Sequence, residues 1–178
     1  VGFHDRVVRE VMVPRVDITS LETSSTLAEL LRIIEDKGHS RVPVYEESLD
    51  NVKGVVYAKD LLRMLVHRNN VDLDKSVADL IAEDAHSVPN GVPFAHEPYY
   101  TPETKKIDEL LRDLRTARTR LAIVVDEYGG TAGLVTTEDL IEEIVGELQD
   151  EYDAEEALIE WRREDILAVK PRINIEEL

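Results

Sequence analysis

The 178-residue chain contains no cysteine, and this absence excludes several classes of site. There can be no disulfide framework, no thiolate metal site and no cysteine nucleophile, a composition that fits a reducing compartment such as the cytosol. Basic residues are also scarce, because 21 Lys and Arg stand against 38 Asp and Glu, for a net charge of −17. Since the nucleic-acid backbone is bound by clustered Lys and Arg, we expect no nucleic-acid partner.

Long apolar runs are missing as well. No run approaches the roughly 20 residues that cross a bilayer, and the first residues lack the apolar centre of a signal peptide. The chain starts at Val1 instead of methionine and stops on an acidic stretch at Leu178. We therefore expect a soluble piece of a longer protein.

Motifs of catalysis and metal binding are absent too. The sequence has no HExxH, no G-x-S-x-G and no P-loop ending, and no two histidines are four residues apart. Gly129, Gly130 and Gly133 are better explained by a tight hairpin turn than by a phosphate loop. We expect neither an enzyme nor a protein-held metal ion.

What is present is a repeat. Three pairs of residues are separated by the same 79 positions: Arg41 and Arg120, Gly54 and Gly133, Asp60 and Asp139. In each copy an apolar run follows the arginine, a polar turn leads to the glycine, and the aspartate starts an amphipathic helix. The repeat predicts two copies of one supersecondary unit, related by a pseudo-twofold axis, with matched clefts.

Apolar spacing and turn residues predict the elements of each copy. For the first copy we expect a short helix over residues 4–11, a strand over 17–21, and a helix that Ser24, Ser25 or Thr26 caps and Gly38 ends. A strand pair over 42–45 and 52–57, a helix from Asp60 and a short helix over 77–81 complete it. For the second copy we expect a strand over 98–101, a helix over 107–114, a hairpin over 121–135 and a helix over 137–148.

These elements predict five segments along the chain. Residues 1–16 form a leading helix and linker, 17–83 the first repeat, 84–97 a linker rich in proline, and 98–152 the second repeat. Residues 153–178 form an acidic connector followed by the start of a further unit, because Ile166 to Val169, Ile173 and Ile175 alternate like strands.

The most specific local motif is GLVTTED, residues 133–139, in which a strand ends in a hydroxyl and passes into a helix headed by a carboxylate. Thr136 and nearby backbone amides can donate to a sugar or a phosphate at the helix N-terminus. Asp139 can accept from two neighbouring ribose hydroxyls. Alternatively, Thr136 or Thr137 caps the helix and Asp139 complements its dipole, and the motif taken alone favours the cap.

Four motifs together resemble one known family. They are EVMVPR at 10–15, SRVPVY at 40–45, DNVKGVVYAKD at 50–60 and DEYGGTAGLVTTED at 126–139. Residues 7–152 thereby resemble the CBS-domain pair of the CorC/HlyC (TlyC-like) family, which is associated with magnesium and cobalt transport and related to the cyclin M transporters. The resemblance implies an α/β tandem CBS-domain pair (Bateman module) with pseudo-twofold symmetry and small mixed sheets flanked by helices.

The same resemblance implies a site for the adenosine of AMP or ATP between the repeats. Thr136 and Asp139 would hold the ribose, and Arg41 and Arg120 would meet the phosphates, with Mg²⁺ bound through them, unless either arginine lies in a surface ion pair. The residues implied to complete the cleft are Asp17, Ile18, Ser40, Arg41, Val42 and Pro43.

The first copy departs from the family pattern, because Tyr57 stands where a threonine or serine is expected. We expect one occupied cleft per chain, with Tyr57 packed inside the module or at the rim of that cleft. The resemblance further implies a homodimer, a transmembrane domain before Val1, a truncated CorC-type domain after residue 153 and a cytoplasmic location. The chain would then regulate a membrane divalent-cation transport protein. Alternatively, it is a structural dimerisation scaffold whose clefts bind nothing.

Overall fold

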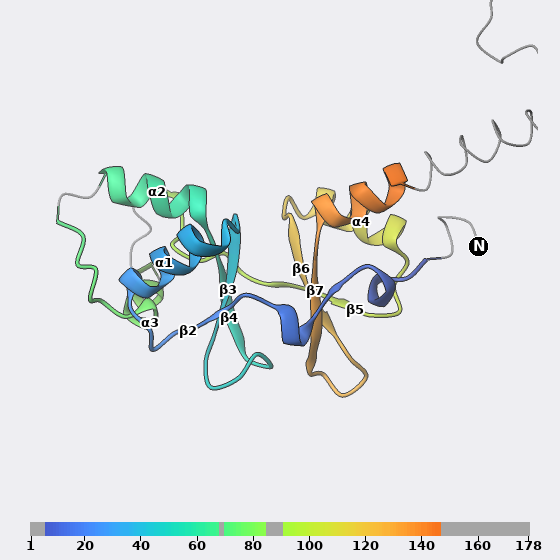
Figure 1. The fold of residues 1–178 in the computed structure, drawn as a ribbon, viewed down its shortest axis with the longest axis horizontal. Helices are drawn as coiled ribbons and strands as arrows, with labels where there is room; N and C mark the ends of the chain where they lie inside the picture. Colours follow the sequence, from blue (N-terminus) through green and yellow to red (C-terminus); the bar gives the residue numbers. More distant parts are fainter. Residues whose placement is uncertain (1–5, 68–69, 85–90, 147–178) are drawn as a thin grey trace, which may run out of the picture. The chain divides into compact units, whose positions relative to one another are not determined.

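A computed structural model describes residues 6–67, 70–84 and 91–146, which form two small mixed sheets with helices packed on them (Figure 1). One sheet has the strand order β1-β7-β6-β5, formed by Val13–Pro14, Thr131–Thr136, Leu121–Val125 and Tyr99–Pro102. The other has the order β2-β3-β4, formed by Leu21–Glu22, Arg41–Tyr45 and Val52–Tyr57.

Both sheets contain the same unit, so the predicted duplication is confirmed. In the first, β2 runs parallel to β3 through helix α1 (Leu27–Lys37), and β3 pairs antiparallel with β4. In the second, β5 runs parallel to β6 through α4 (Ile107–Thr116), and β6 pairs antiparallel with β7. A helix follows each hairpin: α2 (Ala58–His67) after β4, and one beginning at residue 137 after β7. Helix α3 (Val77–Asp84) is three residues longer than predicted.

The ends of α1 show how local sequence sets an element. Of the three predicted caps it is Thr26 that acts: its hydroxyl accepts from the Glu29 amide, while the Glu29 carboxylate accepts from the Thr26 amide at 2.8 Å. At the other end Gly38 adopts φ +67°, a left-handed conformation that costs glycine little. Leu27 and Leu30 face the core between these ends.

The repeat offset of 79 holds only after the hairpin turns, which corrects one of the three predicted matches. Gly54 and Gly133 do correspond, but before the turns the offset is 80: Val42 and Val44 occupy the places of Ala122 and Val124. The cause is the length of the turns. Residues 46–51 connect the two strands of the first hairpin, whereas residues 126–130 connect those of the second, so the second turn is one residue shorter. Arg120 therefore corresponds to Ser40, and Arg41 to Leu121, so the two arginines are not repeat equivalents.

The start of the chain also differs from the prediction. In place of a helix over residues 4–11, a 3₁₀ turn covers Val8–Glu10, and the predicted strand over 17–21 is a 3₁₀ turn at Arg15–Asp17 followed by β2. Strand β1 joins the sheet of the second repeat by antiparallel pairing with β7. Pro14 is tolerated there because β1 is an edge strand, where a missing N–H need not break the ladder. Residues 13–19, called the N-terminal segment below, thus pass from one sheet to the other.

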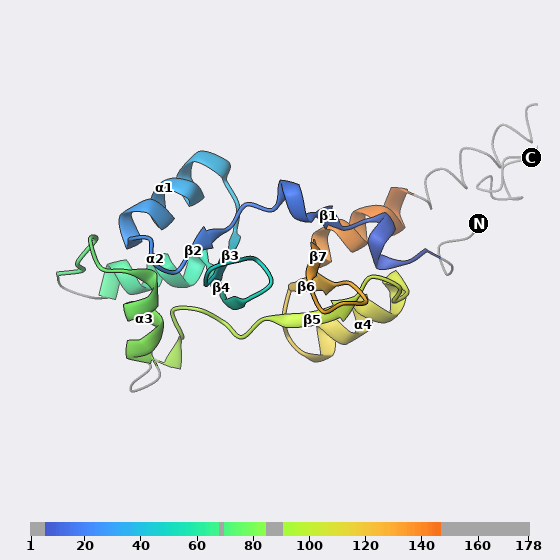
Figure 2. The same ribbon diagram turned by 90° about the horizontal axis from the view of Figure 1, so that it is seen from below.

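Three apolar clusters hold these elements together. One lies under α1 and α2 in the first repeat, and one under α4 in the second, where it includes the fully buried Val8. The third contains Val52 and Val55 from the first hairpin and Leu121, Ile123 and Leu134 from the second. Figures 1 and 2 show the two hairpins side by side, so this third cluster joins the repeats.

Some predictions lie outside the described residues, namely the connector and strands of segment 153–178 and most of the linker before residue 91. The five segment boundaries remain predictions. Within residues 6–67, 70–84 and 91–146, no helix is both long and apolar enough to cross a membrane.

Candidate functional site

A cleft of about 320 Å³ lies between the repeats, at the end of the sheets where β7 passes into its helix. This volume is in the range typical of small-molecule sites, about 300–1,000 Å³. Its walls come from the N-terminal segment, the turn after α1 and the second repeat. The lining residues are Val13, Asp17, Ile18, Thr19, Gly38, His39, Ser40, Arg41, Leu121, Leu134, Thr136, Glu138 and Asp139.

Thr136 and Asp139 form one corner of this cleft. The Asp139 Oδ2 accepts from the Thr136 amide at 2.9 Å and from the Thr136 hydroxyl at 2.6 Å, while the Asp139 amide donates to the Thr136 hydroxyl at 3.3 Å. This is a reciprocal helix cap, so the capping role considered from the sequence is present. The cap uses one carboxylate oxygen. No hydrogen bond to Oδ1 is found within the described part of the chain, which leaves an oriented acceptor at a cleft wall.

The cleft has an apolar side and a polar side. Val13 and Leu134 are paired across β1 and β7, and together with Ile18 and Leu121 they provide aliphatic walls. Arg41, Glu138 and Asp139 provide charge. Such a combination suits a ligand with a flat apolar ring at one end and hydroxyl or anionic groups at the other.

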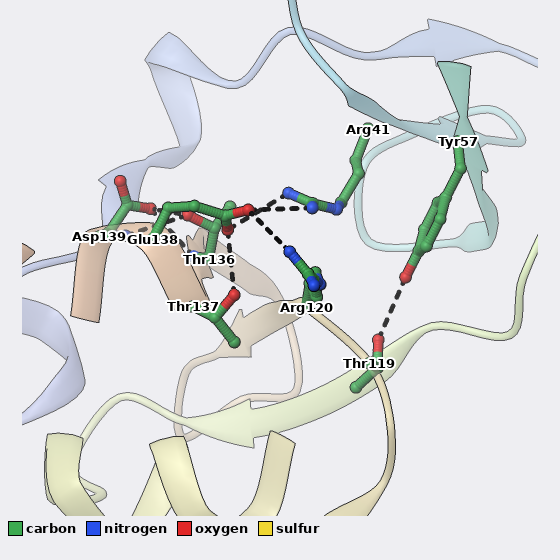
Figure 3. A network of polar contacts seen from close by, with 8 residues as sticks. All are labelled: Arg41, Tyr57, Thr119, Arg120, Thr136, Thr137, Glu138 and Asp139. Atoms are coloured by element: carbon green, nitrogen blue, oxygen red, sulfur yellow. Dashed lines mark hydrogen bonds and ion pairs between the residues drawn. The ribbon is translucent and has the colours of Figure 1, made fainter. Parts of the chain in front are cut away.

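Arg41 makes an ion pair across the repeats in this cleft (Figure 3). Its Nη2 donates to Glu138 Oε1 at 3.0 Å and its Nη1 to Oε2 at 3.3 Å, the fork geometry in which guanidinium binds a carboxylate. Arg120 Nη1 lies 3.8 Å from the same Oε1. Burial acts to raise the pKa of Glu138, but hydrogen bonds from its own amide, Arg41 and Thr137 outweigh it and hold this pKa below its usual value.

The structure brings most of the predicted site residues together. Six of the nine line the cleft: Asp17, Ile18, Ser40, Arg41, Thr136 and Asp139. Val42 does not, because its side chain is fully buried in the core of the first repeat, and neither does Pro43, which is buried on β3. Arg120 is 68% exposed and is not among the lining residues, although its Nη1 lies 3.8 Å from Glu138, which is. That any of the nine binds a ligand remains a prediction.

Sequence reasoning missed several lining residues, with Glu138 the most consequential. Glu138 lies between the predicted Thr136 and Asp139, so its closeness to the site could have been inferred from the motif. Its ion pair with Arg41 could not, because the two residues are 97 positions apart in the sequence. Leu121 and Leu134 could have been found as apolar residues at the strand ends beside the motif. His39 could have been found as the neighbour of Ser40.

The corresponding corner of the first repeat is used differently. Asp60, the equivalent of Asp139, lies 2.7 Å from His96 Nε2. The ring of His96 stacks on Tyr57 with 4.2 Å between centroids, and the Tyr57 hydroxyl lies 3.3 Å from the Thr119 hydroxyl of the second repeat. Tyr57 also lies beneath the Arg41 guanidinium, 5.7 Å from its ring centroid. Here a histidine of the chain itself takes the carboxylate, so the two corners are not chemically equivalent.

Duplicated βαβ–hairpin units that share a central apolar cluster, with a cleft at a strand-to-helix corner, define a tandem CBS-domain pair. The chain belongs to the CBS-domain family, whose model, described as "CBS domain", matches residues 8–67 and 94–146. The α/β tandem fold predicted from the sequence is thereby confirmed.

Among curated proteins, the chain is 38% identical over 152 residues to the magnesium and cobalt efflux protein CorC of Escherichia coli K12, which confirms the predicted resemblance. The match covers 85% of this chain but 46% of CorC, so the chain spans less than half of that relative. It is 37% identical to a UPF0053 protein of Mycobacterium tuberculosis, over 98% of this chain and 37% of that protein.

Solved structures that are similar to this chain include CBS domains with bound nucleotides. The CBS domain of a bacterial CNNM/CorC family Mg²⁺ transporter in complex with ATP is 43% identical, with a TM-score of 0.67 over 81% of this chain and 90% of that chain. A CBS-domain pair from Klebsiella pneumoniae with bound AMP is 26% identical, with a TM-score of 0.61 over 78% of this chain and 98% of that chain.

Proposed function

We propose that this chain is a regulatory module that binds one adenine nucleotide, AMP or ATP with Mg²⁺, in the cleft between its repeats. The observation that carries the proposal is the Asp139 carboxylate, which Thr136 orients while its Oδ1 remains without a partner within the described residues. The two lone pairs of this Oδ1 can accept from two neighbouring ribose hydroxyls. The ATP-bound and AMP-bound structures similar to this chain support the assignment.

The rest of the cleft fits the remaining parts of a nucleotide. The adenine would lie between the aliphatic walls, with Ile18 on one side and Leu134 on the other. The phosphates would extend toward Arg41. Because Glu138 already occupies Arg41, a polyphosphate would have to displace this carboxylate or bridge to it through Mg²⁺, which favours the magnesium complex of ATP.

The module would act within a larger protein. Similarity to CorC supports a place in a membrane protein for divalent-cation transport, with a transmembrane domain ahead of this chain and the module on the cytoplasmic side. Its role there would be regulatory and not catalytic. A nucleotide shifts such a protein only by binding one of its conformations more tightly than another.

We also propose that the module forms a homodimer. Leu62 and Val66, four residues apart on α2, are 62% and 70% exposed. Ile141 and Val145 have the same positions in the helix after β7 and are 50% and 46% exposed. Exposed aliphatic pairs at the i, i+4 spacing are typical of helices that pack against a partner.

Calorimetry with AMP, ADP and ATP, each with and without Mg²⁺, tests the nucleotide proposal. Asp139→Ala should weaken binding by about tenfold to a hundredfold, since hydrogen bonds to a charged group contribute roughly 1.5–3 kcal/mol each. Asp60→Ala is the matched control, because it removes the equivalent carboxylate, which His96 occupies. Equal weakening in the two variants would exclude Asp139 as the ribose ligand.

The second candidate function is a dimerisation scaffold with empty clefts. It is favoured by the first-repeat corner, where His96 and Tyr57 have replaced the ligand-binding chemistry. No heat of binding and no thermal shift at millimolar nucleotide would support the scaffold and reject the sensor.

A further inference from the structure

Arg15 joins three separate parts of the fold. From the 3₁₀ turn of the N-terminal segment its Nη1 donates to Asp50 Oδ1, in the turn of the first hairpin, and to the Thr131 carbonyl, at the start of β7, at 2.9 Å. The Thr131 amide donates to the same Asp50 oxygen at 2.8 Å. The Thr131 hydroxyl donates to the Leu49 carbonyl at 2.6 Å. The four residues Arg15, Leu49, Asp50 and Thr131 are called the hairpin clamp below.

The clamp is held by charge as well as by hydrogen bonds. The pKa of Asp50 is held below its usual value, first by the hydrogen bond from Arg15 and second by the one from the Thr131 amide. Asp50 is therefore ionised at neutral pH, and the same Arg15 Nη1 donates both to its carboxylate and to the Thr131 carbonyl.

The clamp lies next to the nucleotide cleft in the chain without lining it. Arg15 is absent from the cleft walls, but Val13 before it and Asp17 and Ile18 after it are part of them. The turn is short and closed on itself, since the Ile18 amide donates to the Arg15 carbonyl at 3.3 Å. Arg15 is thus only two or three residues away from the wall residues Val13, Asp17 and Ile18.

A second wall is tied to the same point. Thr131 begins β7, the strand that carries Leu134 and Thr136 into the cleft, and β7 pairs with Val13 through Leu134. Asp50 belongs to the hairpin of the first repeat, whose strand β3 begins at Arg41. A single side chain therefore links the N-terminal segment, the second repeat and the first repeat, which together make the three walls.

We propose that Arg15 is a positioning residue for the nucleotide: it fixes the N-terminal segment to both hairpins and so sets the distance between the cleft walls. The proposal rests on the proposed function. It predicts that the clamp and the nucleotide site are coupled in both directions. If the clamp contacts favour the conformation that binds nucleotide, bound nucleotide must stabilise those contacts by the same free energy. Nucleotide should then protect the clamp although it does not touch it.

The test compares Arg15→Ala with Lys53→Ala. Lys53 is a matched control, because it lies in the same hairpin region and pairs with Glu46 at 2.9 Å within the first repeat only. Calorimetry with ATP–Mg²⁺ and with AMP should show about fivefold to tenfold weaker binding for Arg15→Ala, and less than about twofold change for Lys53→Ala. Arg15→Lys, which keeps the charge but replaces the planar guanidinium by a compact ammonium, should lie between wild type and alanine.

Amide hydrogen exchange separates positioning from a general loss of stability. Without ligand, Arg15→Ala should speed exchange at the Ile18 and Thr131 amides and leave that of Leu30, in the core of the first repeat, unchanged. In wild type, nucleotide should slow exchange at Thr131, and in Arg15→Ala this slowing should be lost. If Arg15→Ala folds poorly, Asp50→Asn can replace it, because asparagine still provides an acceptor for the Thr131 amide but removes the charge that pairs with Arg15. The same changes in affinity and in amide exchange are expected.

Two results would overturn the proposal: wild-type affinity in Arg15→Ala, or weakened affinity with unchanged exchange at Ile18 and Thr131. A wild-type chain that binds no nucleotide would instead reject the proposed function. Ligand-free exchange would still decide whether Arg15 holds the wall in place.

Discussion

At the scale of single residues, Glu138 decides how the arginines of the cleft are used. Its carboxylate takes the position that an anionic ligand would need, forked with Arg41 and near Arg120. The pair joins the two repeats, because Arg41 begins β3 of the first and Glu138 lies in the helix after β7 of the second. Without ligand, the guanidinium is therefore neutralised internally.

Replacing Glu138 by glutamine should change the metal dependence of nucleotide binding. With the negative charge gone, Arg41 can turn to the phosphates, and repulsion between carboxylate and phosphate disappears. We expect ATP without Mg²⁺ to bind about tenfold more tightly, and ATP–Mg²⁺ to change much less. Calorimetry in EDTA and in Mg²⁺ measures both. Glu142→Gln, one turn further along, is the control, and an equal gain there would point to net charge alone.

The same pair makes a pH prediction for the ligand-free chain. Because the pKa of Glu138 is lowered in the folded state, its contribution to stability is complete above its usual value of 4.5 and is lost as the pH falls through the lowered value. Thermal unfolding of wild type and Glu138→Gln should therefore differ at pH 7, and the difference should disappear as the pH falls through the lowered pKa of Glu138. A difference that persists at the lower pH would show that Arg41 and Glu138 are not the cause.

At the scale of elements, the close approach of β1 to β7 explains why residue 133 is a glycine. A Cβ on Gly133 would overlap the Val13 carbonyl oxygen and come within 2.8 Å of the Met12 sulfur. The first repeat has the same requirement, since a Cβ on Gly54 would lie 2.8 Å from Ala95 Cβ. The segment before the first repeat thus crosses β7 at Gly133, and the segment before the second repeat crosses β4 at Gly54. Each segment crosses the hairpin of the other repeat.

Gly133→Ala should therefore displace β1 and disturb a cleft wall. Overpacking costs typically about 1–3 kcal/mol, which should appear as a lower thermal midpoint. Nucleotide affinity should fall too, because Val13 lines the cleft. Gly146→Ala is the contrasting variant: its Cβ meets nothing within 4 Å, and alanine in a helix should stabilise by up to about 1 kcal/mol. Unchanged stability in Gly133→Ala would mean that β1 can move aside at no cost.

Local sequence was enough to predict some elements and not others. Helix α1 and the two hairpins carry their own caps, periodicity and turn residues, so they could be predicted. Strand β1 could not, because its partner lies more than a hundred residues away and two-residue strands have no periodicity. The match of Arg41 with Arg120 was wrong because a turn one residue shorter shifts the register of one strand pair relative to the other.

In the candidate site, too, residues of one local motif could be predicted, and residues brought in from distant segments could not. Thr136 and Asp139 are part of one contiguous motif and were predicted together, whereas the walls that face them come from distant segments. Val42 and Pro43 were included for their closeness in sequence to Arg41. Alternation along β3 turns Val42 into the core, so closeness in sequence did not bring it into the cleft.

At the scale of the whole molecule, the proposed homodimer can be tested through α2. Replacing Leu62 and Val66 by glutamate places charges where apolar surface would be buried, so the variant should be monomeric by light scattering after size-exclusion chromatography. Its thermal midpoint should change little at low concentration, since both side chains are exposed. Leu73→Glu, also exposed, should remain dimeric. A wild-type chain that is monomeric at every concentration would reject the dimer.

The pairing of β1 with β7 also sets an order of events during synthesis. Val13 is synthesised about 120 residues before its partner Leu134, a delay of roughly 6–24 s at ordinary translation rates. During that time β1 has no partner strand, and the sheet of the second repeat is completed only when this earlier segment pairs with β7. A nascent chain stalled before residue 131 should therefore leave Val13 and Pro14 open to proteases.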